Sequence, residues 1–237
     1  MGKHSSAKAT KAFWTPRTIA AVGAMVIGAL IMVYPSVAGW LNNRTQQNDS
    51  VAYEQAINND LTREEVAQIR DRAVVYNDNL VPLSKGYVMT EEDIEAYNEV
   101  LDPADNGMMG YVTIPALDVE VPIYHGSSDE IMRMGAGHIE GTSMPVGGPS
   151  THAAITAHRG EPGSDYFLHL DKLAEGDTFS VTVLGETLTY EVDKISVVEP
   201  DDVSELAIVE GEDLFTLLTC TPVTLNTHRL LVRGHRV

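Results

Sequence analysis

Cysteine is the scarcest reactive residue in this sequence: its 237 residues contain one, Cys220. A single cysteine cannot form an intrachain disulfide, so the chain is not a disulfide-stabilised scaffold. A thiol without a bridge is either a small buried hydrophobic group or a reactive group. The residues around Cys220 therefore decide between a packing role and a chemical role.

Basic residues are also scarce, and they are unevenly distributed. Lys3, Lys8, Lys11 and Arg17 all precede the first acidic residue, Asp49; removing these four from the 16 basic residues leaves 12 against 34 acidic ones. Everything after Arg17 thus carries a net charge of −22. Because phosphate binding requires a cationic surface, nucleic acid is not an expected partner of the main domain.

Charge is absent from the stretch between Thr18 and Trp40, TIAAVGAMVIGALIMVYPSVAGW. As a helix rising about 1.5 Å per residue, it is long enough to cross the roughly 30 Å core of a bilayer. Four basic residues lie before it and one, Arg44, closely follows it, and this excess on the N-terminal side predicts a cytoplasmic tail at 1–17, a single-pass anchor at 18–41 and an extracellular remainder. A cleaved signal peptide is the alternative, because PSVAG offers small residues for processing, but the apolar run exceeds the usual apolar region of such a peptide, about 7–15 residues.

Residues 42–104 are predicted to form an extracellular helical stalk. Thr62 and Glu65 fit a capping box at a helix start, and a second short helix is expected to begin at Thr90 and to stop before Pro103. Apolar residues recur at helical spacing in the first helix: Val66, Ile69, Ala73 and Val74.

Residues 105–237 read as a mainly β domain with about eight strands. Short runs rich in β-branched and aromatic residues alternate with Gly, Pro, Asp and Ser, which indicates a closed barrel or a sandwich. Two segments, 127–135 and 164–173, are predicted to be short connecting helices. The predicted strands lie within 110–117, 119–126, 151–159, 177–185, 186–200, 214–220 and 228–237.

Three reactive side chains are expected at strand ends of this domain. Cys220 closes the run LFTLLTC before Pro222, and Arg229 opens the following strand, so a hairpin would bring the guanidinium beside the thiol. His158 lies at the exit of AAITAHRG, before a Gly-rich loop. A thiol, an imidazole and a guanidinium can support acyl transfer through a thioester: nucleophile, general acid/base and oxyanion donor.

These segments resemble those of the sortases, the cysteine transpeptidases anchored outside Gram-positive membranes. TLLTCTP is similar to the sortase nucleophile segment, ITAHRG to its histidine segment and NTHRLLVRGHR to its arginine segment. The resemblance covers roughly residues 105–237 and implies a closed sortase-type β-barrel. It also implies Cys220 as nucleophile, His158 as general acid/base and Arg229 as the residue that positions substrate and stabilises the oxyanion.

The long helical region before the barrel is similar to that of class C sortases, which assemble pili and carry an Asp-Pro-aromatic lid. Asp102 and Pro103 match the first two lid positions, and Asp102 is expected to pair with Arg229 when the lid is closed. Ala104 stands where the family has its aromatic residue. Thr219 is a weaker candidate for substrate binding.

The activity that this resemblance implies is a two-step exchange. Cys220 would cleave the Thr–Gly bond of an LPXTG-like sorting signal on a pilin or another surface protein, and a pilin lysine would resolve the acyl-enzyme. No metal or organic cofactor is required. Two alternatives stay open: a housekeeping class A or E type sortase that acts on a cell-wall precursor, and a non-enzymatic surface module with a vestigial site.

Other residues compete less well for these roles. Arg233 lies on the same predicted face as Arg229, but the family spacing favours Arg229, and alternation places His228 on the opposite face. Four further histidines lack metal-ligand spacing and are interpreted as turn, barrel or surface groups: His125, His138, His152 and His169.

Overall fold

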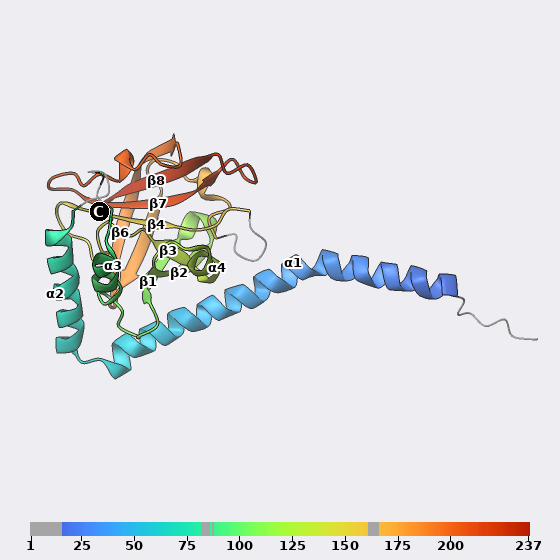
Figure 1. Cartoon of the computed structure of the whole chain (residues 1–237). Coiled ribbons are helices and arrows are strands. Elements are labelled where there is room, and N and C mark those ends of the chain that lie inside the picture. The colour runs from blue at the N-terminus through green and yellow to red at the C-terminus, as the bar shows by residue number, and fades with distance from the viewer. Residues whose placement is uncertain (1–15, 82–85, 87, 161–165) are drawn as a thin grey trace, which may run out of the picture.

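The computed structural model describes residues 16–81, 86, 88–160 and 166–237 (Figure 1). Helices precede a β-barrel. The helical elements are α1 (Pro16–Gln55), the π-helical η1 (Ala56–Asp60), α2 (Arg63–Asn79), α3 (Glu91–Asn98), α4 (Asp129–Met134) and the 3-10 turns η3 (Pro115–Leu117), η4 (Leu170–Lys172) and η5 (Ser204–Leu206). The strands are β1 (Met108–Ile114), β2 (Val119–His125), β3 (Ala136–His138), β4 (Thr151–Thr156), β5 (Thr178–Val183), β6 (Glu186–Val198), β7 (Asp213–Thr221) and β8 (His228–Arg236).

The eight strands form a closed barrel in the order β1-β2-β3-β4-β7-β8-β6-β5. Most neighbours are antiparallel, whereas β2 pairs with β3, and β4 with β7, in parallel. The predicted fold class is therefore confirmed. β3 is the strand that the sequence did not predict, because Ala-Gly-His is too short to show an alternating pattern.

Alternation along the strands builds two apolar clusters. The larger fills the barrel, where Phe179, Tyr190 and Phe215 meet with ring centroids 5.3 to 5.9 Å apart. A smaller cluster, in which Ala154, Leu206 and Leu231 are buried, is separate from that core and includes a residue of β8 and one of η5. The outer face of β4, β7 and β8 is therefore partly covered.

The two helices expected within residues 42–104 are present. Thr62 with Glu65, and Thr90 with Asp93, form capping boxes at the starts of α2 and α3. Of the apolar residues predicted to line α2, Ile69 and Ala73 are buried, whereas Val74 is 39% exposed. Of the two predicted connections, the first contains α4, and the second contains only the short turn η4, with residues 164 and 165 outside the described part.

Helix α1 is continuous across the expected boundary at residue 41, and its stretch from Pro16 to Tyr34 is long and apolar enough to cross a membrane. Its other end packs on the barrel, and the helix extends well beyond it (Figure 1). The buried Tyr53 hydroxyl donates to the Met109 carbonyl (2.8 Å) and accepts from the Leu184 N–H (2.9 Å). These two bonds fix the end of α1 to strand β1 and the β5–β6 turn.

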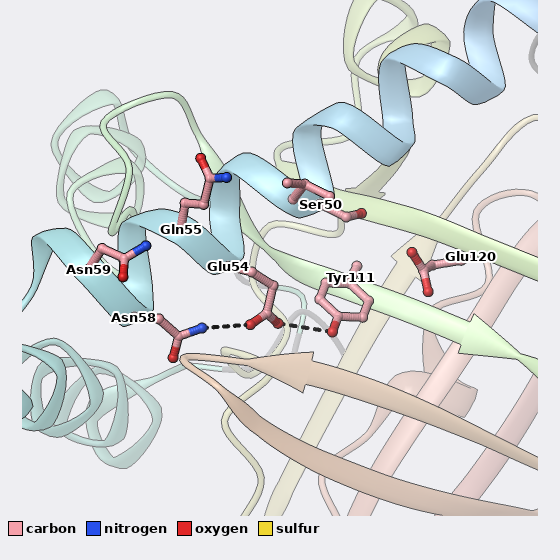
Figure 2. Close-up of a pocket in the computed structure, with 8 residues that line it drawn as sticks. Ser50, Glu54, Gln55, Asn58, Asn59, Tyr111 and Glu120 are labelled. Atoms are coloured by element: carbon pink, nitrogen blue, oxygen red, sulfur yellow. Dashed lines mark hydrogen bonds between the residues drawn. The ribbon is translucent and has the colours of Figure 1, made fainter.

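A pocket of about 490 Å³ lies beside this attachment (Figure 2). Glu54 on α1 accepts hydrogen bonds from the Tyr111 hydroxyl (3.0 Å) and the Asn58 amide (3.1 Å). The residues that line the pocket come from α1, η1, β1 and β2. The three predicted catalytic residues are not among the lining residues.

Candidate active site

The cysteine lies one residue before the end of β7. Phe215 and Leu217 point into the barrel core, whereas Leu218 packs in the outer cluster, so alternation places Cys220 on the outer face with Leu218. Its thiol is free and the residue is half-buried. A thiol at this strand end is accessible to a peptide on the outside of the barrel.

The arginine is held directly opposite. Cys220 and Arg229 are partners in the antiparallel β7–β8 register. Directly opposed residues share a face, with Cβ atoms about 4.5–5.5 Å apart. The Arg229 guanidinium donates to the carbonyls of Asn226 (3.3 Å) and His228 (3.2 Å), and no described carboxylate pairs with it. Its remaining donors are available to a substrate carbonyl.

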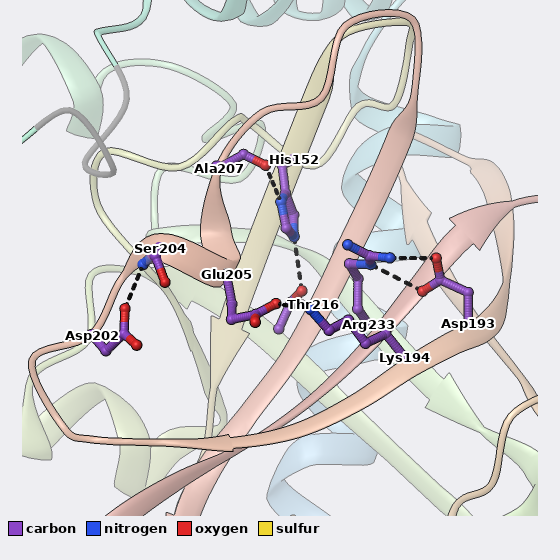
Figure 3. Close-up of polar contacts among 9 residues, drawn as sticks. All are labelled: His152, Asp193, Lys194, Asp202, Ser204, Glu205, Ala207, Thr216 and Arg233. Atoms are coloured by element: carbon purple, nitrogen blue, oxygen red, sulfur yellow. Dashed lines mark hydrogen bonds and ion pairs between the residues drawn. The ribbon is translucent and has the colours of Figure 1, made fainter.

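The rival arginine is already occupied. Arg233 forms a two-pronged ion pair with Asp193, with nitrogen–oxygen distances of 3.0 and 2.7 Å (Figure 3). The hydrogen bonds to Asp193 raise the pKa of this guanidinium above its ordinary value. The geometry therefore favours Arg229 as the arginine of the site.

The histidine follows β4 on the other side of β7. Thr156 pairs with Leu218 in the parallel register, and the Ala157 N–H continues the ladder by donating to the Leu218 carbonyl (3.2 Å). The same register places His158 level with Cys220. One face of the barrel thus carries three residues at neighbouring strand ends: His158 just after β4, Cys220 near the end of β7 and Arg229 near the start of β8.

This arrangement has the parts of an acyl-transfer site. A thiol can attack a carbonyl carbon, an imidazole can exchange the protons of the nucleophile and the leaving amine, and a guanidinium can stabilise negative charge on the carbonyl oxygen. Each group comes from a different strand of one rigid sheet. The spacing of the three is therefore set by strand register.

Thr219 faces the other way. It is fully buried, and its hydroxyl donates to the Ala157 carbonyl (2.7 Å). Because neighbouring residues on a strand point to opposite faces, a threonine beside an outward cysteine must point inward. In this structure Thr219 therefore links β7 to the chain before His158, and its hydroxyl does not lie on the outer face with Cys220.

Asp102 and Pro103 lie in the turn before β1. The Asp102 carboxylate accepts from the N–H groups of Asn106 (3.0 Å) and Gly107 (3.0 Å). It forms no ion pair with Arg229, although both side chains are in the described part of the chain. The strand that follows, β1, is adjacent to β2 and β5 and not to β7 or β8. The predicted closed pairing is therefore not present in this structure.

Three of the remaining histidines are polar groups of the barrel, and the first of them, His125, contacts the carbonyls of Gly107 (3.0 Å) and Val100 (2.6 Å). His138 is fully buried between the Tyr97 hydroxyl and the Ser143 carbonyl, both 2.9 Å away, and burial lowers its pKa to about 4. His152 contacts Ala207 and Thr216 (Figure 3), and burial also lowers its pKa. Among the described residues, no group of three or more His, Cys, Asp or Glu side chains is placed to hold a metal ion.

Sequence reasoning missed one residue next to this site. Arg159 directly follows His158, is almost fully buried, and contacts the residue that directly follows Cys220. Its position in AHRG was a signal, since a charged residue just after a buried strand requires a partner when it is not exposed.

Comparison with known proteins identifies the family of this domain. A sortase domain model matches residues 112–237. The crystal structure of sortase C1 from Streptococcus agalactiae superimposes with a TM-score of 0.75 at 42% identity, over 80% of this chain and 98% of that chain. Streptococcus pneumoniae sortase C, a structure described in terms of catalysis and pilin substrate specificity, gives 0.69 at 39% identity, over 80% of this chain and 96% of that chain.

Curated sequences match a shorter region. Sortase D of Bacillus subtilis is 25% identical over 138 residues, which are 57% of this chain and 67% of that protein. The chain spans between about half and two thirds of the length of the curated relatives it matches. The structural matches, at 80% of this chain, therefore extend beyond residues 112–237 into the N-terminal helices. Together with the barrel and its three reactive strand ends, these matches show that the chain belongs to the sortase family of cysteine transpeptidases.

Proposed function

We propose that this protein is a membrane-anchored, pilus-assembling sortase. The observation that carries the proposal is the placement of His158, Cys220 and Arg229 at the ends of three adjacent strands, on one outer face of the barrel. An extended sorting peptide lying along that face would meet all three groups at once.

In the first step, the Cys220 sulfur attacks the threonine carbonyl of an LPXTG-like signal. The guanidinium of Arg229 binds the carbonyl oxygen as it becomes negative, and its planar group of donors suits this role. The Thr–Gly bond breaks as His158 gives a proton to the leaving glycine amine. The product is a thioester between Cys220 and the threonine.

In the second step, a neutral lysine amine of another pilin attacks that thioester. His158 removes the extra proton from the attacking amine, the carbon–sulfur bond breaks, and the thiol of Cys220 is restored. An isopeptide bond now joins the two pilins, and repetition extends the polymer. No redox change occurs, so the exchange balances without a cofactor.

The pilus class is supported by the extent of the structural similarity. The matches to solved sortase C chains include the helices that precede the barrel, and one of those proteins is described by its pilin specificity. A housekeeping sortase of class A or E would share the barrel and the first step but would use an amine of the cell-wall precursor. The acceptor is therefore what separates the two functions.

Membrane anchoring by α1 is part of the same proposal. The stretch from Pro16 to Tyr34 is uncharged after Arg17, and its apolar part is not buried against the rest of the protein. The basic residues before it favour a cytoplasmic N-terminus. That orientation places the barrel on the extracellular side, where pilins and wall precursors are found.

The experiment is a competition between acceptors, followed by mass spectrometry. Full-length protein in detergent is incubated with an LPXTG-type peptide and equal amounts of a lysine-containing peptide, with its α-amine blocked, and an oligoglycine peptide. The proposal predicts an isopeptide product on the lysine side chain. A product on the oligoglycine amine alone would replace the pilus function with a housekeeping function, and hydrolysis without transfer would contradict both.

A further inference from the structure

The buried arginine next to the catalytic histidine makes an unusual set of contacts. The side chain of Arg159 is 6% exposed. Its Nε donates to the Leu168 carbonyl (3.1 Å), one Nη donates to the Thr221 hydroxyl (3.0 Å), and the other lies 2.8 Å from the Asp171 carboxylate. One guanidinium thus joins three segments: the end of β7, the chain before η4, and η4 itself.

The contact with Thr221 connects the two catalytic strand ends. Arg159 directly follows His158, and Thr221 directly follows Cys220. The last backbone hydrogen bond between these segments, among the described residues, is the one from Ala157 to Leu218. Beyond that bond, the Thr219 hydroxyl donates to the Ala157 carbonyl, and past the histidine and the cysteine the Arg159 side chain continues the link by donating to Thr221.

Other contacts fix the histidine from the opposite side. The Phe167 N–H donates to the His158 carbonyl (3.2 Å), and Arg159 holds the carbonyl of the next residue, Leu168. Gly160 follows Arg159 with a φ of +85°, a conformation that favours glycine. A Cβ at this position would also lie only 2.7 Å from the Val223 side chain. The backbone around His158 is therefore held on both sides.

Stability alone does not account for a charged group in this place. Burying a guanidinium has a desolvation cost, and an apolar side chain of similar volume often stabilises a core as well as an ion pair does. Asp171 is itself 53% exposed, so it compensates the charge only in part. What an apolar residue cannot supply is directional bonds to Thr221 and Leu168 at the same time.

We propose that Arg159 is a positioning residue that holds His158 level with Cys220 through the Thr221 hydroxyl, with Asp171 and Leu168 orienting its guanidinium. The inference rests on the proposed sortase function of Cys220 and His158. Because proton transfer and attack depend on the relative placement of imidazole and thiol, a displacement of about 1 Å costs up to about 100-fold in rate.

The test compares the buried Arg159 with the partly buried Arg233 on the same barrel. Arg159→Met removes the link, and Arg233→Met is the matched control, since Arg233 also forms a partly buried ion pair but is four residues along β8 from Arg229. In full-length protein we measure the melting temperature, kcat and KM for sorting-peptide cleavage, and the pH dependence of Cys220 alkylation. We expect both variants to melt earlier, and only Arg159→Met to lose kcat, by about 10- to 100-fold with KM little changed.

Thr221→Val tests the hydrogen bond between Arg159 and Thr221 without removing the positive charge of Arg159. This variant keeps the side-chain shape and removes the hydroxyl that accepts from Arg159. We expect it to lower kcat as well, and to cause no further loss in the Arg159→Met background, because both changes break one contact. Independent, multiplying effects would overturn the inference, and so would a wild-type kcat in Arg159→Met.

The alkylation arm does not depend on the sorting peptide. If imidazole and thiol are in contact, His158→Ala changes the pH profile of Cys220 alkylation, and Arg159→Met is expected to shift the profile in the same direction. A wild-type profile in Arg159→Met, with a changed one in His158→Ala, would refute the positioning role. Wild-type protein that forms no acyl-enzyme would instead refute the proposed function, so the two failures are distinguishable.

Discussion

Cys220 and Arg229 are direct partners across β7 and β8, although they are nine residues apart in the sequence. The hairpin between them brings the thiol and the guanidinium onto the same face. The guanidinium donates to the backbone carbonyls of Asn226 and His228, and among the described residues no carboxylate pairs with it. It is thereby available for a substrate carbonyl.

Arg229→Lys is expected to reduce peptide cleavage strongly. Lysine keeps the positive charge but loses the planar group of donors, and removal of one oxyanion donor typically costs about 100- to 1000-fold in kcat. The measurement is steady-state cleavage of a fluorogenic sorting peptide. In contrast, Arg233→Lys should lower the melting temperature and leave kcat close to wild type. Equal losses in the two variants would contradict the assignment.

Strand alternation and strand ends made most of this site predictable from the sequence. Cys220, His158 and Arg229 each stand at the boundary of a readable β-segment, and a hairpin accounts for the proximity of two of them. The parallel pairing of β4 with β7, which brings His158 level with Cys220, joins segments about 60 residues apart. No local pattern in the sequence indicates that pairing.

Contacts between distant segments were less predictable. The hydrogen bond from the buried Thr219 hydroxyl to the Ala157 carbonyl joins residues 62 positions apart, and no local pattern in the sequence indicates it. The role of Asp102 depends on whether its carboxylate finds the N–H groups of its own turn or a distant guanidinium, and the local partners, four and five residues away, were the ones formed. Short-range capping of this kind is typical of aspartate.

Asp102→Ala is expected to destabilise the protein rather than activate it. Loss of the two hydrogen bonds to Asn106 and Gly107 should cost about 1–2 kcal/mol in the free energy of unfolding. Thermal melting and peptide cleavage are measured together. A lower melting temperature with unchanged cleavage supports the turn, whereas faster cleavage at an unchanged melting temperature would restore the lid interpretation.

The stability of the protein is expected to fall between pH 6.5 and 4 because of His138. Burial lowers the pKa of this imidazole from 6.5 to about 4, so the unfolded chain binds a proton that the folded protein does not. The stabilisation is complete above pH 6.5 and is lost as the pH falls toward 4, by up to about 3 kcal/mol.

His138→Gln tests this origin, because glutamine keeps hydrogen-bonding capacity without titrating in that range. Melting temperatures are recorded from pH 7.5 to 4.5. The variant should be less stable at neutral pH but should lose less stability on acidification. The same slope in both proteins would assign the acid sensitivity to other groups.

Tyr53→Phe is expected to weaken the attachment of α1 to the barrel. The change leaves the buried Leu184 N–H and the Met109 carbonyl without their partner, at a cost of about 1–3 kcal/mol. Tyr111→Phe removes a more exposed hydroxyl from the same region and should cost less. Limited proteolysis of full-length protein checks this order, with faster cleavage near residue 55 expected in Tyr53→Phe. Indistinguishable digestion of the two variants would contradict it.

The most direct test of the account is the intact mass of the protein after incubation with an LPXTG-type peptide. Full-length protein and its Cys220→Ala variant are treated in parallel without an acceptor amine. The account predicts a mass increase equal to the N-terminal peptide fragment, ending in threonine, in the wild-type protein alone. The same adduct on Cys220→Ala, or no adduct on wild-type protein across a panel of sorting peptides, would contradict the assignment of Cys220 as the nucleophile of a sortase.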